Sequence, residues 1–251
     1  MWSANFVRSL GFILMIGSLS MPTIGTAQRN EMPADYPNSL RGQLSSLETQ
    51  LRSNPRSTSL LVQLSEAYFD IGDDLLTDEA ERLEAYEAGA EAAEQAIALD
   101  ENNADAHFFH AVNLGSAERL RGMANAAFAA REVRRCAERA IALDPAHAQA
   151  LQMLGGLLIE LPWFLGGDDT KAQAYLERAI AADGTYTHAR ILVAKLYRKQ
   201  GRLEEARRQL RAVIQAEHPR YRYTWERQYK PEAERLLEEL TDSAAPKSRP
   251  H

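Results

Sequence analysis

Residues 137–145 read AERAIALDP, which describes the end of a helix followed by a stop. Ala137 and Ala140 are three residues apart and share one helix face, where their small side chains let a second helix come close. Pro145 disfavours helical geometry at Asp144 and so ends the helix. The same phrase returns as EQAIALD at 94–100, as ERAIAAD at 177–183 and, more weakly, as LRAVI at 210–214. We therefore expect a chain built from repeated helical units.

The distance between copies of this phrase measures the repeat. The anchor residues are Ala96, Ala140, Ala179 and Val213, and the intervals between them are 44, 39 and 34 residues. Self-similarity at such a period indicates a helical array. The last interval has the length of a tetratricopeptide repeat, and this unit has residues of that pattern at Val193, Ala194, Tyr197, Gly201, Ala206, Leu210 and Val213. The chain thus resembles the tetratricopeptide repeat superfamily over residues 57–219.

The fold expected is all-α, a tetratricopeptide-like helical-repeat superhelix of about four helix pairs with flanking N- and C-terminal helices. A helix pair cannot bury its apolar face alone, so neighbouring pairs stack. Small residues where the two helices of a pair approach are Ser65, Ala111, Gly155 and Ala194. The first three units have extra residues between their helices, around 73–78, 122–128 and 161–169, which longer helices or elaborated turns would hold.

The two ends of the chain have their own signals. Arg8, the apolar run 10–19 and the small residues 25–27 predict a signal peptide over 1–27, cleaved after Ala27. An uncleaved membrane anchor is the alternative, although the run is short for a bilayer. No cysteine follows the run for a lipid anchor, so we expect an exported, soluble, periplasmic protein. The remaining ranges are a lead-in and N-terminal helix at 28–56, a C-terminal capping helix at 220–240 and a disordered tail at 241–251.

Charge and cysteine content narrow the classes further. The net charge of −6 over 251 residues does not favour nucleic acid as a partner. Fourteen acids and one base lie in 66–105, whereas twelve bases and six acids lie in 195–235; these are either two solvated faces or a dipolar surface that orients a partner. Cys136 is the only cysteine, which excludes an internal disulfide. It is expected to be a small buried residue, a reactive thiol beside Arg134 and Arg135 being the alternative.

A more particular resemblance begins at residues 161–168, which read LPWFLGGD and lead into a helix ending at Ala179. Together with the long first and second units and the segment from Trp225 to Leu237, this is similar to the T-component family of TRAP transporters. The resemblance implies an extracytoplasmic role in solute uptake. It also implies binding to a solute-binding protein, self-association and a groove able to hold an apolar ligand. Members of that family are often lipid-anchored, and this chain lacks the necessary cysteine.

The LPWFLGGD segment also has two local interpretations. The two glycines permit positive φ, and Asp168 or Asp169 can cap the following helix, so a structural turn is expected. Trp163 and Phe164 precede this turn. They either plug the core or form the wall of a groove.

We expect no enzyme, no cofactor and no metal site. His107 and His110 are three apart with Asp105 close by, but no third clear ligand accompanies them, so they are interpreted as packing or surface residues. No Ser/His/Asp or Cys/His motif is present. Gly155 and Gly156 lie in a predicted helix and lack the Lys-Ser or Lys-Thr of a phosphate loop.

Binding is the activity that stacked helix pairs favour, because their curvature creates a concave surface lined by the first helix of each pair. The partner or ligand groove predicted by register, together with the two aromatic residues above, comprises Val62, Phe69, Phe108, Val112, Gln152, Ile159, Trp163, Phe164, Ile191, Lys195 and Arg198. This lining is mostly apolar, with bases at its C-terminal end. It predicts an apolar or amphipathic partner with an acidic end.

The function predicted is that of an exported, non-enzymatic repeat protein that mediates protein–protein interaction as an accessory component of TRAP-type solute uptake. The partner would then be an extracytoplasmic solute-binding protein. Two alternatives stay open. One is a general envelope scaffold or assembly factor, and the other is a carrier of an apolar small molecule in a groove walled by Trp163 and Phe164.

Overall fold

The computed structural model of the chain describes residues 35–242, and within this range it contains helices and no strand. None of the helices in the described range is both long and apolar enough to cross a membrane. The predicted signal segment, most of the lead-in and nearly all of the predicted tail lie outside the described residues.

Four helix pairs follow one another along the chain, with a single helix before them and another after them. The helices are α1 (Ser39–Ser53), α2 (Thr58–Asp70), α3 (Glu79–Leu99), α4 (Ala104–Leu120), α5 (Met123–Leu143), α6 (Ala148–Glu160), α7 (Asp169–Ala182), α8 (Thr187–Lys199), α9 (Leu203–Ile214), α10 (Arg222–Thr224) and α11 (Lys230–Asp242). Three short segments complete the set: η1 (Ile71–Leu75), η2 (Trp163–Leu165) and η3 (Trp225–Tyr229). The predicted fold, an all-α array of four helix pairs with flanking helices, is confirmed.

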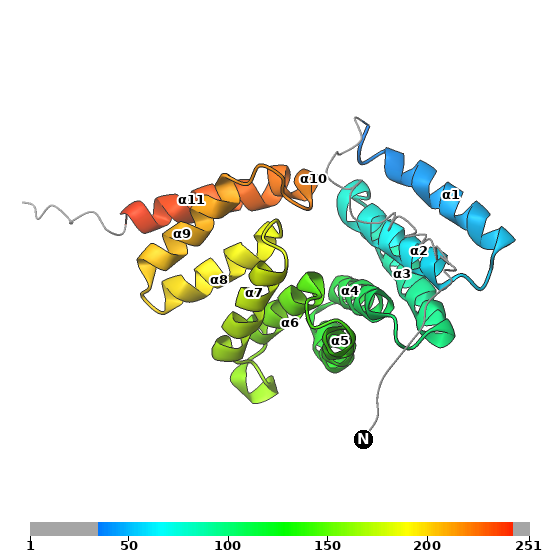
Figure 1. The fold of residues 1–251 in the computed structure, drawn as a ribbon, viewed down its shortest axis with the longest axis horizontal. Coiled ribbons are helices and arrows are strands. Elements are labelled where there is room, and N and C mark those ends of the chain that lie inside the picture. Colours follow the sequence, from blue (N-terminus) through cyan, green and yellow to red (C-terminus); the bar gives the residue numbers. More distant parts are fainter. Residues whose placement is uncertain (1–34, 243–251) are drawn as a thin grey trace, which may run out of the picture.

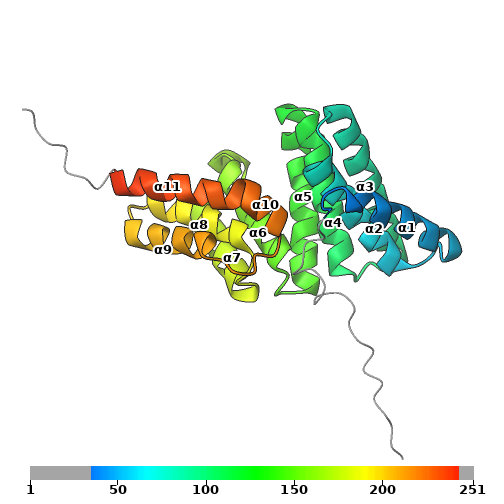
Figure 2. The same cartoon turned by 90° about the horizontal axis from the view of Figure 1, so that it is seen from above.

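The pairs follow a curved path, and the segment after the last pair returns toward the first pair. In Figure 1 the path runs from α1 through α5 to α11, and α10 returns to the neighbourhood of α2. Figure 2 shows that α3, α4 and α5 lie side by side and that α8, α9 and α11 run at a steep angle to them. The concave side of this curve is where the repeat pattern places a binding surface.

The phrase that defines the repeat ends three helices in the same way. Asp100, Asp144 and Asp183 each follow the last residue of a helix. The side-chain Oδ1 of each accepts a hydrogen bond from the backbone N–H two residues on, at 3.0, 3.0 and 2.9 Å respectively. Such a local bond competes with helical geometry and forms a turn. The predicted stop after each copy is confirmed.

Small residues bring the paired helices together, as the pattern predicts. Gly155 of α6 packs against α7, and a Cβ there would lie 2.7 Å from Cγ of Leu176. In the first pair the contact is polar, because the Ser65 hydroxyl donates to the carbonyl of Gly89 at 2.7 Å. Asn113 of α4 donates in turn to the Ser65 hydroxyl at 3.1 Å, and its own side chain fills the space beside Gly89.

The extra residues of the first three units are accommodated in two ways. In the second unit they are helical, since α5 has 21 residues and the connection before it consists of Arg121 and Gly122, the glycine at φ 118°. In the first unit α3 also has 21 residues, and η1 takes up part of the rest. In the third unit α7 has 14 residues, and the extra residues form η2 and the turn after it.

Candidate binding groove

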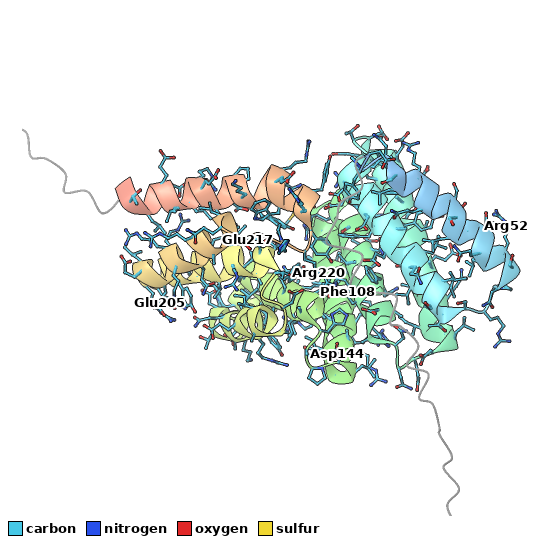
Figure 3. All side chains as sticks on the ribbon, turned by 45° about the horizontal axis from the view of Figure 1, so that its top comes forward. Arg52, Phe108, Asp144, Glu205, Glu217 and Arg220 are labelled. Carbon is cyan, nitrogen blue, oxygen red and sulfur yellow. The ribbon has the colours of Figure 1, made fainter. Side chains whose placement is uncertain are left out.

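An open groove of about 960 Å³ lies on the concave side of the array. Its walls come from α1, α2, the turns before α4 and α6, the end of α7 and the segment 220–224. We call residues 220–224 the strap, because they cross from α9 to the N-terminal side of the groove. Figure 3 shows Arg220 of the strap near the middle of the molecule.

Carboxylates dominate the charge of this groove. Those in its lining are Glu66, Asp70, Asp74, Asp105, Asp144 and Asp183. Among the described residues of the lining, the arginines are Arg220 and Arg222. Arg220 pairs with Asp183 at 2.9 Å, and Arg222 pairs with Glu226 at 2.9 Å. The groove is therefore acidic, and both of these arginines already pair with carboxylates of the chain itself.

The strap closes onto the N-terminal end of the array. The ring of Tyr223 meets the ring of Tyr36 edge-on, with centroids 5.0 Å apart. The hydroxyl of Thr224 donates to Asp74 Oδ1 at 3.2 Å, and the Tyr36 hydroxyl donates to Asp74 Oδ2. Burial raises the pKa of Asp74 above its ordinary value, and it raises the pKa of Tyr36 as well.

Tyr221 anchors the middle of the strap. Its ring meets Tyr186 edge-on with centroids 5.8 Å apart, and its hydroxyl accepts a hydrogen bond from the Gln149 amide at 3.2 Å. Burial raises the pKa of both tyrosines, so both stay neutral at physiological pH. The strap is thus held by packed rings at one end and by Asp74 at the other.

One histidine fixes the orientation of a groove carboxylate. His147 precedes α6, and its Nδ1 accepts the backbone N–H of Ala150 at 3.2 Å. Its Nε2 therefore donates, and it lies 3.1 Å from Asp105 Oδ1. His147 is buried while the Asp105 carboxylate is exposed, so the pair places this carboxylate at the groove wall.

The residues predicted to line the groove lie in different environments in the structure. Val62 is part of the lining. Phe108 is buried against Phe109 and His147, with ring centroids 5.0 and 5.1 Å away, and does not reach an open surface. Ile191 is fully buried in the core of the C-terminal half, so it cannot contact a partner.

The remaining apolar and amide positions pack within the array. Phe69 is half-buried, and its ring lies 6.1 Å from that of Tyr86. Val112 and Ile159 are half-buried against the two larger core clusters. Gln152 accepts a hydrogen bond from the hydroxyl of Tyr186 at 2.8 Å.

The basic end predicted for the groove is neutralised by the chain itself. Lys195 pairs with Glu232 at 2.7 Å, and Arg198 pairs with Glu239 at 2.8 Å, both glutamates belonging to α11. The capping helix packs on α9 and η3 packs on α8, so that the two glutamates of α11 reach basic residues of α8 where the sequence pattern predicts an open surface. The predicted lining, apolar with a basic end, stays a prediction, and the groove that the structure contains is acidic and shares Val62 with it.

The turn after α6 is structural, as expected. Trp163 and Phe164 are 85% and 67% exposed, so the interpretation that they plug the core is wrong. Neither is part of the lining of the groove described above, and a role as the wall of another groove stays a prediction. The turn that carries them is fixed by its glycines. Gly166 has φ 91°, and a Cβ on Gly167 would lie 1.8 Å from the backbone oxygen of Leu161.

Asp168 completes this turn by capping α7. Its Oδ1 accepts the backbone N–H groups of Thr170 and Lys171, both at 3.0 Å. The Arg134 side chain of α5 donates to the carbonyl of Gly166 at 3.1 Å and ties the turn to the second helix pair. The predicted cap at this position is confirmed.

A second group of titratable side chains lies away from the groove. His110 of α4 and Glu132 and Cys136 of α5 offer donor atoms that all lie within 4.8 Å of one another. The sequence pattern groups His110 with His107 and not with Glu132 and Cys136, because these two come from the next helix. The i, i+4 spacing of Glu132 and Cys136 on α5 is the signal that the sequence offers for this pair. Cys136 is fully buried, as predicted, and burial raises its pKa to about 12.

Comparisons with known proteins agree with this architecture. A tetratricopeptide-repeat family model matches residues 167–223. A thermophilic tetratricopeptide-repeat protein from Thermus thermophilus superposes with a TM-score of 0.57 at 19% identity, covering 74% of this chain and 90% of that chain. PilF of Pseudomonas aeruginosa gives 0.49 at 16% identity, covering 82% of this chain and 89% of that chain. No curated protein sequence matches the chain.

The fold and the concave groove define a tetratricopeptide-type helical-repeat protein, a class that generally serves as a binding scaffold. A further family model, described as "Regulator of microtubule dynamics protein 1-3", matches residues 32–161, which is more than half of the chain. The chain belongs to this family. These matches do not support the expected resemblance to the T-component family.

Proposed function

We propose that this protein is a non-catalytic scaffold whose acidic concave groove binds a positively charged segment of a partner protein. The observation that carries the proposal is the excess of six carboxylates over two arginines in the groove lining; Arg220 pairs with Asp183 of the lining, and Arg222 pairs with Glu226 outside it. A concave surface with charge of one sign concentrates its field and attracts a partner of opposite sign. Such complementarity sets the choice of partner and the rate of encounter.

The size and the opening of the groove favour a peptide over a compact ligand. Its volume of about 960 Å³ is at the upper end of the range of roughly 300–1,000 Å³ typical of small-molecule sites. It is open along the array rather than enclosed. An extended segment carrying Lys or Arg at intervals would place its charges beside Glu66 and Asp70 of α2 and Asp105 of α4 in turn.

Several finer roles would use the same groove with different partners. The sequence predicts export and an accessory role in TRAP-type uptake or envelope assembly. The family of the chain is described as regulating microtubule dynamics. In each case the groove would take a basic segment of the partner, and we propose this chemistry as the common property. No observation favours the carriage of an apolar small molecule.

Fluorescence anisotropy with labelled peptides tests the proposal. A Lys/Arg-rich peptide should bind the full chain more tightly than a Glu-rich peptide of equal length, and its affinity should fall as salt is added. Glu66→Gln should weaken this binding by roughly threefold, the effect of about 0.6 kcal/mol expected for one partly screened charge. Glu138→Gln, an exposed position of α5 outside the groove, is the matched control and should bind as wild type.

Two results would overturn the proposal. One is equal binding of the two peptides. The other is wild-type affinity for the basic peptide in the double variant that carries both Glu66→Gln and Asp70→Asn. Circular dichroism and thermal melting of each variant would show that the fold is intact. If the basic peptide binds, microtubule pelleting and crosslinking to an extracytoplasmic solute-binding protein would then distinguish the finer roles.

A further inference from the structure

A hollow between the second helix pair and α3 contains metal-ligating side chains that the groove does not use. Its volume is about 480 Å³. Its lining consists of Glu94, Ile97, Glu101, His107, His110, Glu132, Arg135 and Arg139. Cys136 lies directly behind it, one helical turn after Glu132.

The donor atoms of three of these side chains are already close to the arrangement that one cation requires. The donors of His110, Glu132 and Cys136 lie within 4.8 Å of one another. Cys136 Sγ lies 3.4 Å from Glu132 Oε1. Donors bound to a single zinc ion at about 2.0–2.3 Å lie roughly 3.5 Å apart in a tetrahedron. Small rotamer changes would therefore complete the geometry.

One ring nitrogen of His110 lies near a backbone carbonyl, a contact that metal-binding histidines commonly make. Its Nδ1 lies 3.4 Å from the backbone carbonyl of Ala90, on the neighbouring helix α3. When Nδ1 donates to that carbonyl, Nε2 carries the free lone pair. Histidine ligands of metals characteristically donate their other ring N–H to a carbonyl or carboxylate in this way, which fixes the tautomer and the ring.

The Arg135 guanidinium lies beside the Glu132 carboxylate, where a bound cation would lie. Arg135 binds the Glu132 carboxylate through Nε at 2.9 Å and Nη2 at 2.5 Å, and the same Nη2 lies 3.7 Å from Cys136 Sγ. The Arg135 side chain is 65% exposed, so it is free to swing into solvent. An exposed ion pair of this kind contributes little free energy and would be exchanged readily.

A second feature of the hollow is an unsatisfied histidine. His107 is 6% exposed and lines the hollow, and its Nε2 lies 2.9 Å from the carbonyl of Glu101. Its Nδ1 has no hydrogen-bond partner among the described residues. A buried polar atom in this state costs free energy unless water or another group satisfies it. A hydrated cation in the hollow would bring water to this region.

We propose that His110, Glu132 and Cys136 bind a divalent transition-metal ion of the zinc type, with water from the hollow as the remaining ligand. The ligand set of one thiolate, one imidazole and one carboxylate suits zinc and cobalt better than magnesium or calcium, which prefer oxygen ligands. The thiol proton leaves to solvent when the sulfur binds the ion.

Cobalt titration of the untagged full chain, kept reduced and freed of metal by a chelator, tests the proposal. Co²⁺ should bind one ion per chain and give the absorption band of a thiolate–cobalt bond, and Zn²⁺ should displace it. Cys136→Ser should abolish this band. Glu132→Gln should weaken binding by about tenfold or more, the usual effect of losing a supporting or direct ligand.

Two variants of α5 should give metal affinities that a general loss of structure would not produce. Arg135→Ala removes the competing guanidinium, so it should tighten binding several-fold. Glu138→Gln changes an exposed acid that is not among the donor residues, and should leave binding unchanged.

The proposal is overturned if the wild-type chain gives no thiolate–cobalt band or if Cys136→Ser keeps the wild-type spectrum. Melting in the presence of chelator would reveal whether Cys136→Ser fails to fold. If Cys136→Ser fails to fold, the test rests on Glu132→Gln and Arg135→Ala, which should change the affinity for Co²⁺ in opposite directions. Unchanged affinity in both variants contradicts the site.

Discussion

The two halves of the array bring their helices together by different means. In the first half, the second helices α3 and α5 are 21 residues long, and a buried polar contact among Ser65, Gly89 and Asn113 joins α2, α3 and α4. In the second half, α7 and α9 have 14 and 12 residues, and α6 meets α7 through Gly155 against Leu176. The family matches divide near the same point, at 32–161 and 167–223. One repeat pattern thus tolerates either polar or apolar contacts, provided that the position is small.

The largest effect is expected in the apolar half, from Gly155→Leu. A Cβ at this position would already lie 2.7 Å from Leu176 Cγ and 2.9 Å from Cδ2, so a full side chain forces α6 and α7 apart. We expect a loss of about 3 kcal/mol in the free energy of unfolding, measured by urea denaturation. Gly42→Ala is the control, because nothing lies within 4 Å of a Cβ there. It should be neutral or slightly stabilising, and a wild-type midpoint for Gly155→Leu would contradict the packing described.

The next effect concerns the polar half, through Gly89→Ala. Its Cβ would lie 2.5 Å from Asn113 Oδ1, and the Asn113 amide would have to leave its bonds to Ser65 and Phe109. We expect a loss of about 2 kcal/mol from crowding and broken hydrogen bonds together.

A double-mutant cycle sharpens this second prediction. In an Asn113→Ala background, Gly89→Ala should cost much less, because the side chain it displaces is gone. Strictly additive losses in thermal or urea melts would show that the two residues do not interact, and the proposed difference between the halves would then fail.

A smaller effect tests a device that both halves share, the side-chain cap at a helix start. The Asn103 side chain accepts the backbone N–H of Ala106 at 2.9 Å and begins α4. Asn103→Ala should cost about 1 kcal/mol, whereas Asn103→Gly should cost only a few tenths. Asp168→Ala should lower the melting temperature in the same direction. A loss confined to one half would mean that the caps are not equivalent.

The smallest effect is a pH dependence where the two halves meet at the strap. Burial raises the pKa of Asp74, so the folded chain binds this proton more tightly than the unfolded chain. The contribution of Asp74 to stability is therefore greatest at acid pH, and it falls as pH rises through the raised folded pKa. Wild type should gain stability relative to Asp74→Asn as pH is lowered from 7 to 4. Parallel pH profiles of the two melting temperatures would contradict this sign.

The fold could be predicted from the sequence because its signals are local. The phrase ending at Asp144 contains both the small residues of a helix contact and the residues of the turn that follows, and the LPWFLGGD segment contains its own glycines and cap. The groove could not be predicted in this way. Whether Lys195 faces a partner depends on where α11 folds back, and Glu232 of that helix is 37 positions further along the chain.

The exposed aromatic residues and the group formed by His110, Glu132 and Cys136 illustrate the same limit. Trp163 is exposed because the turn carrying it points away from the array, and no residue pattern encodes that direction. The i, i+4 pair of Glu132 and Cys136 was visible in the sequence, but the approach of His110 requires the packing of α4 on α5. The features that the sequence does not predict depend on contacts between helices rather than within them.

The turns at the ends of the repeat phrases connect the number of repeats with the negative charge of the groove. Asp144 and Asp183 form the turns between successive pairs, and the same two residues line the groove. Asp100, which forms the same turn in the first copy, is not part of this lining, so only a unit whose turn faces the groove would add a carboxylate to the concave wall. Duplication and deletion of such units would therefore tune the attraction for a cationic partner in steps of a single charge, without any change to the residues in between.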